Sequence, residues 1–140
     1  MKVDFKVIAG LLCGMAAFQI ASAQTYPNRP IRLVIPVQPG SSTNDSIPRY
    51  FARALSTVLG QQVVADNRAG ASGQIASEMV AKAAPDGYTL LVGYTTTLGI
   101  GPSVHANLGY DPDKDLTPVA RLFVSSYVMA VNATVPAPNL

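Results

Sequence analysis

A run of small residues at 67–75, Asn-Arg-Ala-Gly-Ala-Ser-Gly-Gln-Ile, carries the clearest chemical signal in the sequence. It follows a short apolar run and precedes a segment with helical periodicity. A small-residue loop that opens a helix leaves several backbone N–H groups without intrahelical partners. Those donors, together with the positive end of the helix dipole, suit an anion such as a carboxylate or a phosphate. We therefore expect this stretch to hold an anion and not to break a bond.

Two further loops of the same polar, small-residue type occur at 36–45 and 93–97. Both follow an apolar run that is expected to be a strand, and ligands of α/β proteins bind at such strand ends. The same residue types also cap helices and build turns, so each single residue has that structural alternative. Three such loops in succession favour binding. The hydroxyls and amides that they offer belong to Ser41, Ser42, Thr43, Asn44, Asn67, Ser72, Thr95 and Thr96.

Arg68 lies beside the second loop and could pair with a ligand carboxylate. Asp66 and Asp45 are alternative partners within the chain, and we favour this structural pairing. The anion would then be held by directed hydroxyl and N–H dipoles without a full counter-charge.

Other chemistry has weaker support in the sequence. His105 is the only histidine, and no cysteine or second histidine is near enough in sequence to complete a metal site, so we expect a surface or turn residue. Asp111, Asp113 and Asp115 alternate as in part of a calcium loop, but the glycine and the later glutamate of that motif are missing. Neither a Gly-x-Ser-x-Gly nor a Walker sequence is present. We expect no metal and no cofactor.

Residues 1–23 are interpreted as a cleaved secretory signal peptide. Val7 to Ile20 is mostly apolar, and Ala21-Ser22-Ala23 fits a small-x-small cleavage site, which leaves Gln24 as the mature N-terminus. A membrane anchor or an incorrectly assigned start is the alternative. The only cysteine, Cys13, leaves with the signal, so the mature chain would have no disulfide and no cysteine nucleophile.

The charge of the mature chain excludes a typical nucleic-acid-binding face. The 140 residues contain 10 basic and 8 acidic side chains, and loss of Lys2, Asp4 and Lys6 leaves the two signs almost balanced. A nucleic-acid-binding domain would normally be strongly basic on one face.

Hydrophobic patterning predicts an α/β fold. We expect strands at 31–35, 62–65 and 88–93, helices at about 44–60 and 73–83, a weaker helix or turn at 98–104, and an extended run at 119–131. The strands are almost continuously apolar and alternate with helices, which is typical of a mostly parallel sheet covered by helices.

Each of the two main helices has a predicted inward face. For the first helix it consists of Ile47, Tyr50, Phe51, Ala54, Leu55 and Val58. For the second it consists of Ile75, Met79, Val80 and Ala83.

The chain resembles the extracytoplasmic solute receptors of the tripartite tricarboxylate transporter family, also called Bug proteins. The matching pieces are Tyr26–Pro36, Pro39-Gly40 followed by Asp45, the loop 67–75, Val80–Leu91, Tyr110–Val119 and Val131–Ala137. These pieces cover essentially all of 26–140 in order, and the second and third are quite specific.

The resemblance implies a bilobed binding protein, secreted to the periplasm of a Gram-negative bacterium, that passes small di- or tricarboxylates to membrane permease subunits. It implies no catalysis, and we expect a monomer. Residues 24–140 would be the N-terminal lobe, ending near the crossover to a second lobe. Two loops would grip a ligand carboxylate, with a weaker contribution from a third. Carried over, the ligand-binding residues are Ser41, Ser42, Thr43, Asp45, Ala71, Ser72, Gly73, Thr95 and Thr96.

The chain departs from the family pattern in two ways. The usual Pro-Gly-Gly-x-x-Asp loop is one residue longer here and has Ser41 in place of the second glycine, so either Asn44 or Asp45 could be the counterpart of the aspartate. The chain is also less than half the family length, so we expect a truncated product that binds weakly or not at all. The alternatives are a small α/β enzyme that uses helix N-termini as an anion hole, and a fragment without function.

Overall fold

The structure, a computed structural model, describes residues 25–41, 43–105, 107–126, 128, 130–132 and 134 of the 140. The expected signal peptide at 1–23 and the predicted site residue Ser42 lie outside the described residues. In the part of the chain that is described, no helix has the length and apolar character needed to cross a membrane.

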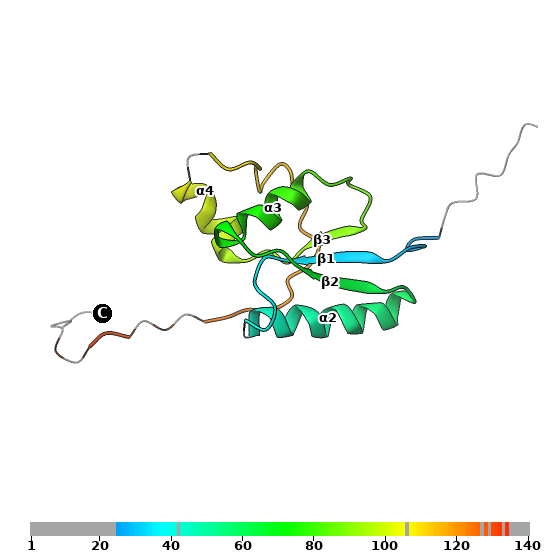
Figure 1. The fold of residues 1–140 in the computed structure, drawn as a ribbon, viewed down its shortest axis with the longest axis horizontal. Coiled ribbons are helices and arrows are strands. Elements are labelled where there is room, and N and C mark those ends of the chain that lie inside the picture. Colours follow the sequence, from blue (N-terminus) through cyan, green and yellow to red (C-terminus); the bar gives the residue numbers. More distant parts are fainter. Residues whose placement is uncertain are drawn as a thin grey trace, which may run out of the picture.

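Three parallel strands form one sheet in the order β2-β1-β3 (Figure 1). They are β1 (Ile31–Ile35), β2 (Val63–Asn67) and β3 (Thr89–Leu91). β1 pairs with β2 along its whole length, from Ile31 opposite Val63 to Ile35 opposite Asn67, and with β3 on its other side. Because β1 is central and covered on both faces, its β-branched side chains are almost fully buried.

Helices cover both faces of this sheet (Figure 1). Helix α2 (Thr43–Leu59) connects β1 to β2 on one face, and α3 (Gln74–Ala81) connects β2 to β3 on the other. A short 3₁₀ turn at Ala71–Gly73 precedes α3, while a π-helical segment at Thr95–Ile100 and α4 (Gly101–Val104) follow β3. Because all three strands are parallel, the loops that follow them gather at one edge of the sheet, which is the usual ligand-binding edge of such sheets.

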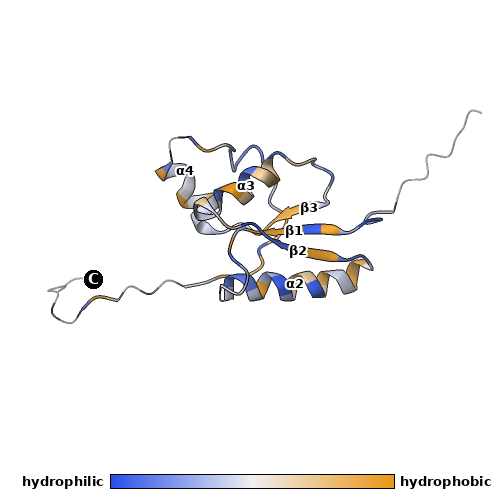
Figure 2. Cartoon of the chain, viewed as in Figure 1, coloured by the Kyte–Doolittle hydropathy of each residue, from blue (hydrophilic) through white to orange (hydrophobic). Residues whose placement is uncertain are grey.

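The hydrophobic core lies between the sheet and α2. Figure 2 shows the apolar colour over much of the strands, whereas α2 carries both colours along its length. The fully buried members are Ile31, Leu33, Ile35, Ala52, Val63 and Val92. The predicted α/β class and the parallel sheet are thus confirmed, although β2 extends two residues further than expected, to Asn67, and β3 is shorter, at Thr89–Leu91.

The predicted inward face of α2 is partly wrong. Tyr50 and Val58 are 77% and 81% exposed, and Ile47 and Ala54 also lie on the exposed side. The buried face instead runs through Asp45, Pro48, Ala52, Leu55 and Leu59. On this face Ala52, Leu55 and Leu59 pack against the core, and the Asp45 carboxylate is held by protein donors at the start of the helix, so both contacts oppose rotation of the helix about its axis.

Two other expectations are also corrected. In α3, Ile75 is 55% exposed, whereas Ala76 and Ser77 are buried and allow close packing. In the run 119–131, the described residues contain no strand. A β-branched pattern indicates only a fit to extended backbone, and a strand also needs a hydrogen-bonding partner. Within this run, Leu122 packs against the core and the Phe123 ring lies 6.4 Å from that of Tyr94.

The corrected face of α2 can be tested with two truncations one helical turn apart. Leu55→Ala removes a side chain that packs against the core and should lower the free energy of unfolding by about 2 kcal/mol. Val58→Ala, on the exposed side, should change it by less than about 0.5 kcal/mol. Urea denaturation of both variants measures this difference. Equal losses would contradict the helix orientation described above.

Candidate functional site

The three loops at the carboxyl edge of the sheet meet at Gly73. A Cβ atom added to Gly73 would lie 2.7 Å from Thr97 Cγ2, in the loop after β3, and 3.0 Å from Pro36 Cβ, in the loop after β1. Only a residue without a side chain allows this approach. The three loops that were singled out from the sequence therefore touch one another at this glycine.

The loop after β2 has a positive φ angle at four consecutive residues. The φ angles are 134° at Gly70, 46° at Ala71, 54° at Ser72 and 89° at Gly73. The two glycines adopt such angles freely, but alanine and serine rarely do, and conformations of this kind cluster at binding sites. The Gly73 N–H closes the turn by donating to Gly70 O at 2.8 Å. The small residues indicated an unusual loop, but nothing in their types showed that Ala71 and Ser72 would be left-handed.

The predicted site contains a set of exposed, uncommitted donors. Among the described residues, no hydrogen bond is made by the hydroxyls of Ser41, Thr43, Ser72, Thr95 and Thr96, nor by the backbone N–H groups of Ala71, Ser72, Thr95 and Thr96. Ser72, Gly73, Thr95 and Thr96 line one hollow together with Asn44. Ser41, Thr43, Ala71 and Asp45 are not among the residues that line it.

Asp45 is buried and its carboxylate is engaged by the protein. Its Oδ2 accepts the Gly40 N–H at 2.8 Å, its Oδ1 accepts Asn67 Nδ2 at 2.8 Å, and Arg49 Nε donates to both oxygens at 2.9 and 3.0 Å. Donation by Arg49, Gly40 and Asn67 lowers the Asp45 pKa from 3.8 to about 2, against the opposing effect of burial. These contacts favour a role for Asp45 in holding the first loop over direct contact with a ligand.

Asn44 and Asp45 have different surroundings in the structure. Asp45 is 4% exposed and occupies the network, whereas Asn44 is exposed and its backbone carbonyl accepts the Tyr94 hydroxyl. Burial, and secondarily the Asp45 charge, raises the Tyr94 pKa, so this hydroxyl remains a donor at neutral pH. Tyr94 thereby ties the third loop to the first.

Two participants in the network were not predicted as site residues. Arg49 pairs with Asp45 one helical turn away, and the i,i+4 spacing of opposite charges was a signal that could have found it. Asn67 was recognised as a loop amide, but its contacts with the first loop had no sequence signal. The two residues also contact each other, because Arg49 Nη2 donates to Asn67 Oδ1.

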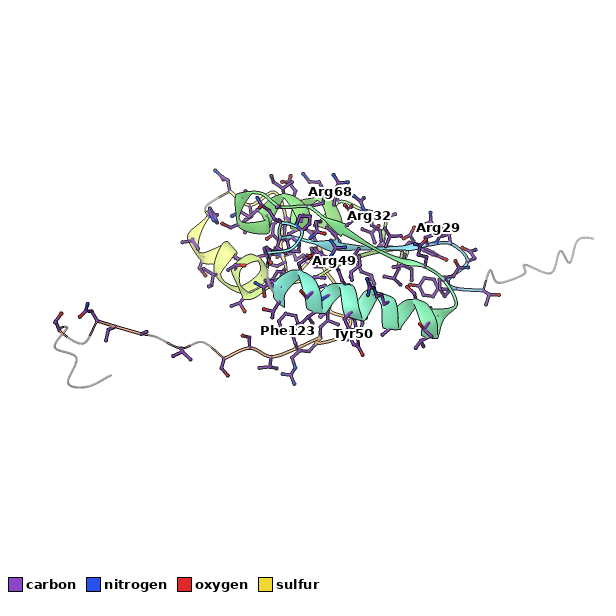
Figure 3. All side chains as sticks on the ribbon, turned by 60° about the horizontal axis from the view of Figure 1, so that its bottom comes forward. Arg29, Arg32, Arg49, Tyr50, Arg68 and Phe123 are labelled. Carbon is purple, nitrogen blue, oxygen red and sulfur yellow. The ribbon has the colours of Figure 1, made fainter. Side chains whose placement is uncertain are left out.

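Arg68 takes the structural role that was favoured from the sequence. Its Nε donates to both Asp66 oxygens at 3.1 Å, and Arg32 Nε donates to the same carboxylate at 2.6 Å. Figure 3 shows Arg68 and Arg32 near each other, apart from Tyr50 and Phe123. The guanidinium of Arg68 is thus paired beside the second loop.

The other candidate residues lie away from this site. His105 is exposed just after α4, and Asp111 pairs with Lys114 in a local turn. Within the described ranges, no cluster of three or more His, Cys, Asp or Glu residues could hold a metal ion.

A family model described as "Tripartite tricarboxylate transporter family receptor" matches residues 47–140. The chain belongs to this family. It is 44% identical over 112 residues to protein BugT of Bordetella pertussis, an alignment that covers 79% of this chain and 34% of BugT. The chain thus spans about a third of the length of this curated relative.

Solved structures agree with the family receptor assignment. MatC from Rhodopseudomonas palustris, solved with bound malate, is 41% identical with a TM-score of 0.65 over 69% of this chain and 33% of MatC. The periplasmic binding protein BugD is 38% identical with a TM-score of 0.60, over 64% of this chain and 29% of BugD. The described α/β unit therefore corresponds to part of a periplasmic binding protein fold.

The close approach at Gly73 gives one testable consequence. Gly73→Ala combines a disfavoured φ with contacts to Thr97 and Pro36, and should lower the free energy of unfolding by about 2–4 kcal/mol. Gly60→Ala is the matched control, since Gly60 also has a positive φ but open space around it, and should cost about 1 kcal/mol. Denaturation of both variants compares them, and equal costs would mean that the loops do not meet as described.

The Asp45 network predicts a pH-dependent stability. Because the folded pKa is depressed, the charged carboxylate stabilises the fold above about pH 3.8, and this contribution is lost as the pH falls through about 2. The difference in unfolding free energy between the wild type and Asp45→Asn should therefore be largest near neutral pH and shrink between pH 4 and pH 2. Urea titrations across this range measure it, with the non-ionisable surface change Thr57→Ala as control. A difference that grew on acidification would contradict the network.

Proposed function

We propose that this chain provides the carboxylate-gripping part of a periplasmic receptor for small organic acids and carries out no catalysis. The observation that carries the proposal is the set of uncommitted hydroxyl and N–H donors on three loops that meet at Gly73. Donors without nearby acceptors attract an anion, and the helix N-termini behind them add a favourable dipole.

The chemistry fits a carboxylate group. The two arginines nearest the loops, Arg49 and Arg68, are both paired with aspartates, so the local field comes from directed dipoles. A carboxylate has two oxygens that can accept donors from different loops at once. The malate-bound relative MatC supports the same ligand class.

We assign ligand contact to the three loops and a supporting role to Asp45. The first loop would contribute Ser41, Ser42 and Thr43. The other two would contribute Ala71, Ser72, Gly73, Thr95 and Thr96. Asp45 would act by fixing the first loop, since its acceptor sites are already used by Gly40, Arg49 and Asn67.

The wider role follows from the family. Residues 24–140 would form the N-terminal lobe, residues 1–23 would direct export to the periplasm, and a monomeric receptor would deliver its ligand to the permease subunits of a tripartite transporter. The lobe offers one wall of a binding cleft, and ligand sites normally enclose most of the ligand. Binding by this chain alone should therefore be weak.

A titration of the ¹⁵N-labelled chain with malate tests the proposal. Malate should shift the amide signals of Ser72, Thr95 and Thr96. The Kd should be about 1 mM or weaker, which corresponds to a binding free energy of about 4 kcal/mol or less, because only one wall of the cleft is present. The Val64 amide, on β2 away from the loops, serves as an internal reference.

Butane-1,2,4-triol, the uncharged analogue of malate, is the matched ligand control and should cause no comparable shifts. The carboxylate assignment would be wrong if the triol and malate acted equally, or if malate moved only signals remote from the three loops. A Kd below about 1 µM would contradict the expectation that one wall binds weakly.

A further inference from the structure

We propose that Asn67 is a positioning residue that fixes the first carboxylate-binding loop relative to the second. The inference rests on the proposed function, but it concerns a side chain that makes no ligand contact in that proposal. Asn67 is the last residue of β2, so its backbone is held by the pairing with Ile35 of β1.

Every polar atom of the Asn67 side chain is used. The amide nitrogen donates one hydrogen to Val37 O at 2.9 Å and the other to Asp45 Oδ1 at 2.8 Å. The amide oxygen accepts Arg49 Nη2. An amide has two donor hydrogens and a carbonyl acceptor, so this one group satisfies three partners from the loop and the helix.

These contacts hold the first loop at two points. Val37 is bound directly by Asn67, and Gly40 is bound through Asp45, whose Oδ2 accepts the Gly40 N–H at 2.8 Å. The segment that leads to Ser41 and Thr43 thus starts from a backbone fixed to the end of β2. Without these bonds, the contact between Pro36 and Gly73 and the bond from Tyr94 to Asn44 would still join the loops, but residues 37–40 would lose their anchor.

The backbone beyond Asn67 continues directly into the second loop. The Arg68 N–H donates to Ile35 O at 2.9 Å, which fixes the point at which that loop leaves the sheet. Asn67 therefore holds the first loop with its side chain while its backbone carries the second. Asn67 thus helps to fix the relative position of the donors on the two loops, together with the contact between Pro36 and Gly73.

No other residue type of similar size matches these contacts. Aspartate would have acceptors only, would lose both donated bonds and would place a second negative charge beside Asp45. Glutamine keeps the amide but displaces it by one methylene, so it can satisfy the three partners only if the loop moves.

The test uses malate titration and hydrogen exchange on the wild type, Asn67→Asp and Asn67→Gln. Asn67→Asp should weaken malate binding at least tenfold and speed exchange of the Gly40 amide at least tenfold, with Asn67→Gln intermediate in both. The Gly73 amide, which is bonded within the second loop, should keep its protection. Asn132→Asp is the matched control. It makes the same chemical change at an exposed residue that is remote from Asn67 in sequence, and it should leave both malate binding and Gly40 exchange unchanged.

A rescue variant separates positioning from general stability. In Asp45→Asn/Asn67→Asp the donor and the acceptor exchange places, so the bond between positions 45 and 67 is restored, and the side-chain oxygen at position 45 still accepts the Gly40 N–H. Gly40 protection and malate affinity should both recover in part relative to Asn67→Asp, although the bond to Val37 stays lost.

These outcomes separate a failure of the proposed function from a failure of the inference about Asn67. If the wild type does not respond to malate, the proposed function fails, while Gly40 exchange in the variants still tests the anchor. If the wild type binds malate and Asn67→Asp binds equally well with unchanged Gly40 exchange, the inference is overturned. If Asn67→Asp does not fold, the same comparison is made with Asn67→Gln, and wild-type values in that variant would overturn the inference.

Discussion

The pairing of β1 with both β2 and β3 is the constraint on which the rest of this structure depends. A central parallel strand must be covered on both faces, so the chain passes from it to α2 on one side and returns through α3 on the other. That path brings the carboxyl ends of all three strands to one edge. The site exists because three loops leave the sheet there, and the absence of a side chain at Gly73 lets them touch.

The charged side chains nearest this site form ion pairs within the protein. Asp45 with Arg49, and Asp66 with Arg68 and Arg32, use the ionised groups nearest the loops in bonds within the protein. The donors left for a ligand are hydroxyls and backbone N–H groups, which are dipoles of fixed direction. In the proposed function, such dipoles would hold a carboxylate without a full opposite charge.

The sequence predicted the large features well, because they follow from composition and period. Continuous apolar runs that alternate with segments of helical periodicity predict a parallel sheet covered by helices. Polar loops after such strands predict a ligand-binding site at the carboxyl ends of the strands. The rotation of α2 was not predictable in the same way. Tyr50 and Val58 fit an apolar stripe as well as Ala52 and Leu59 do. The observed rotation places Asp45 against Gly40 and against Asn67, and Asn67 lies 22 residues further along the chain. The positive φ angles at Ala71 and Ser72 likewise had no signal in the residue types. The run 119–131 has strand preference without a strand in its described residues.

The central claim is that uncommitted donors on the three loops hold a carboxylate. A crystal structure of a malate complex of this chain tests it most directly. The account predicts carboxylate oxygens within about 3 Å of donors on the loops around Ser72 and Thr95, with Asp45 still bonded to Gly40 and Asn67. A carboxylate bound instead by an arginine that had left Asp45 or Asp66, or one bound away from the carboxyl edge of the sheet, would contradict it.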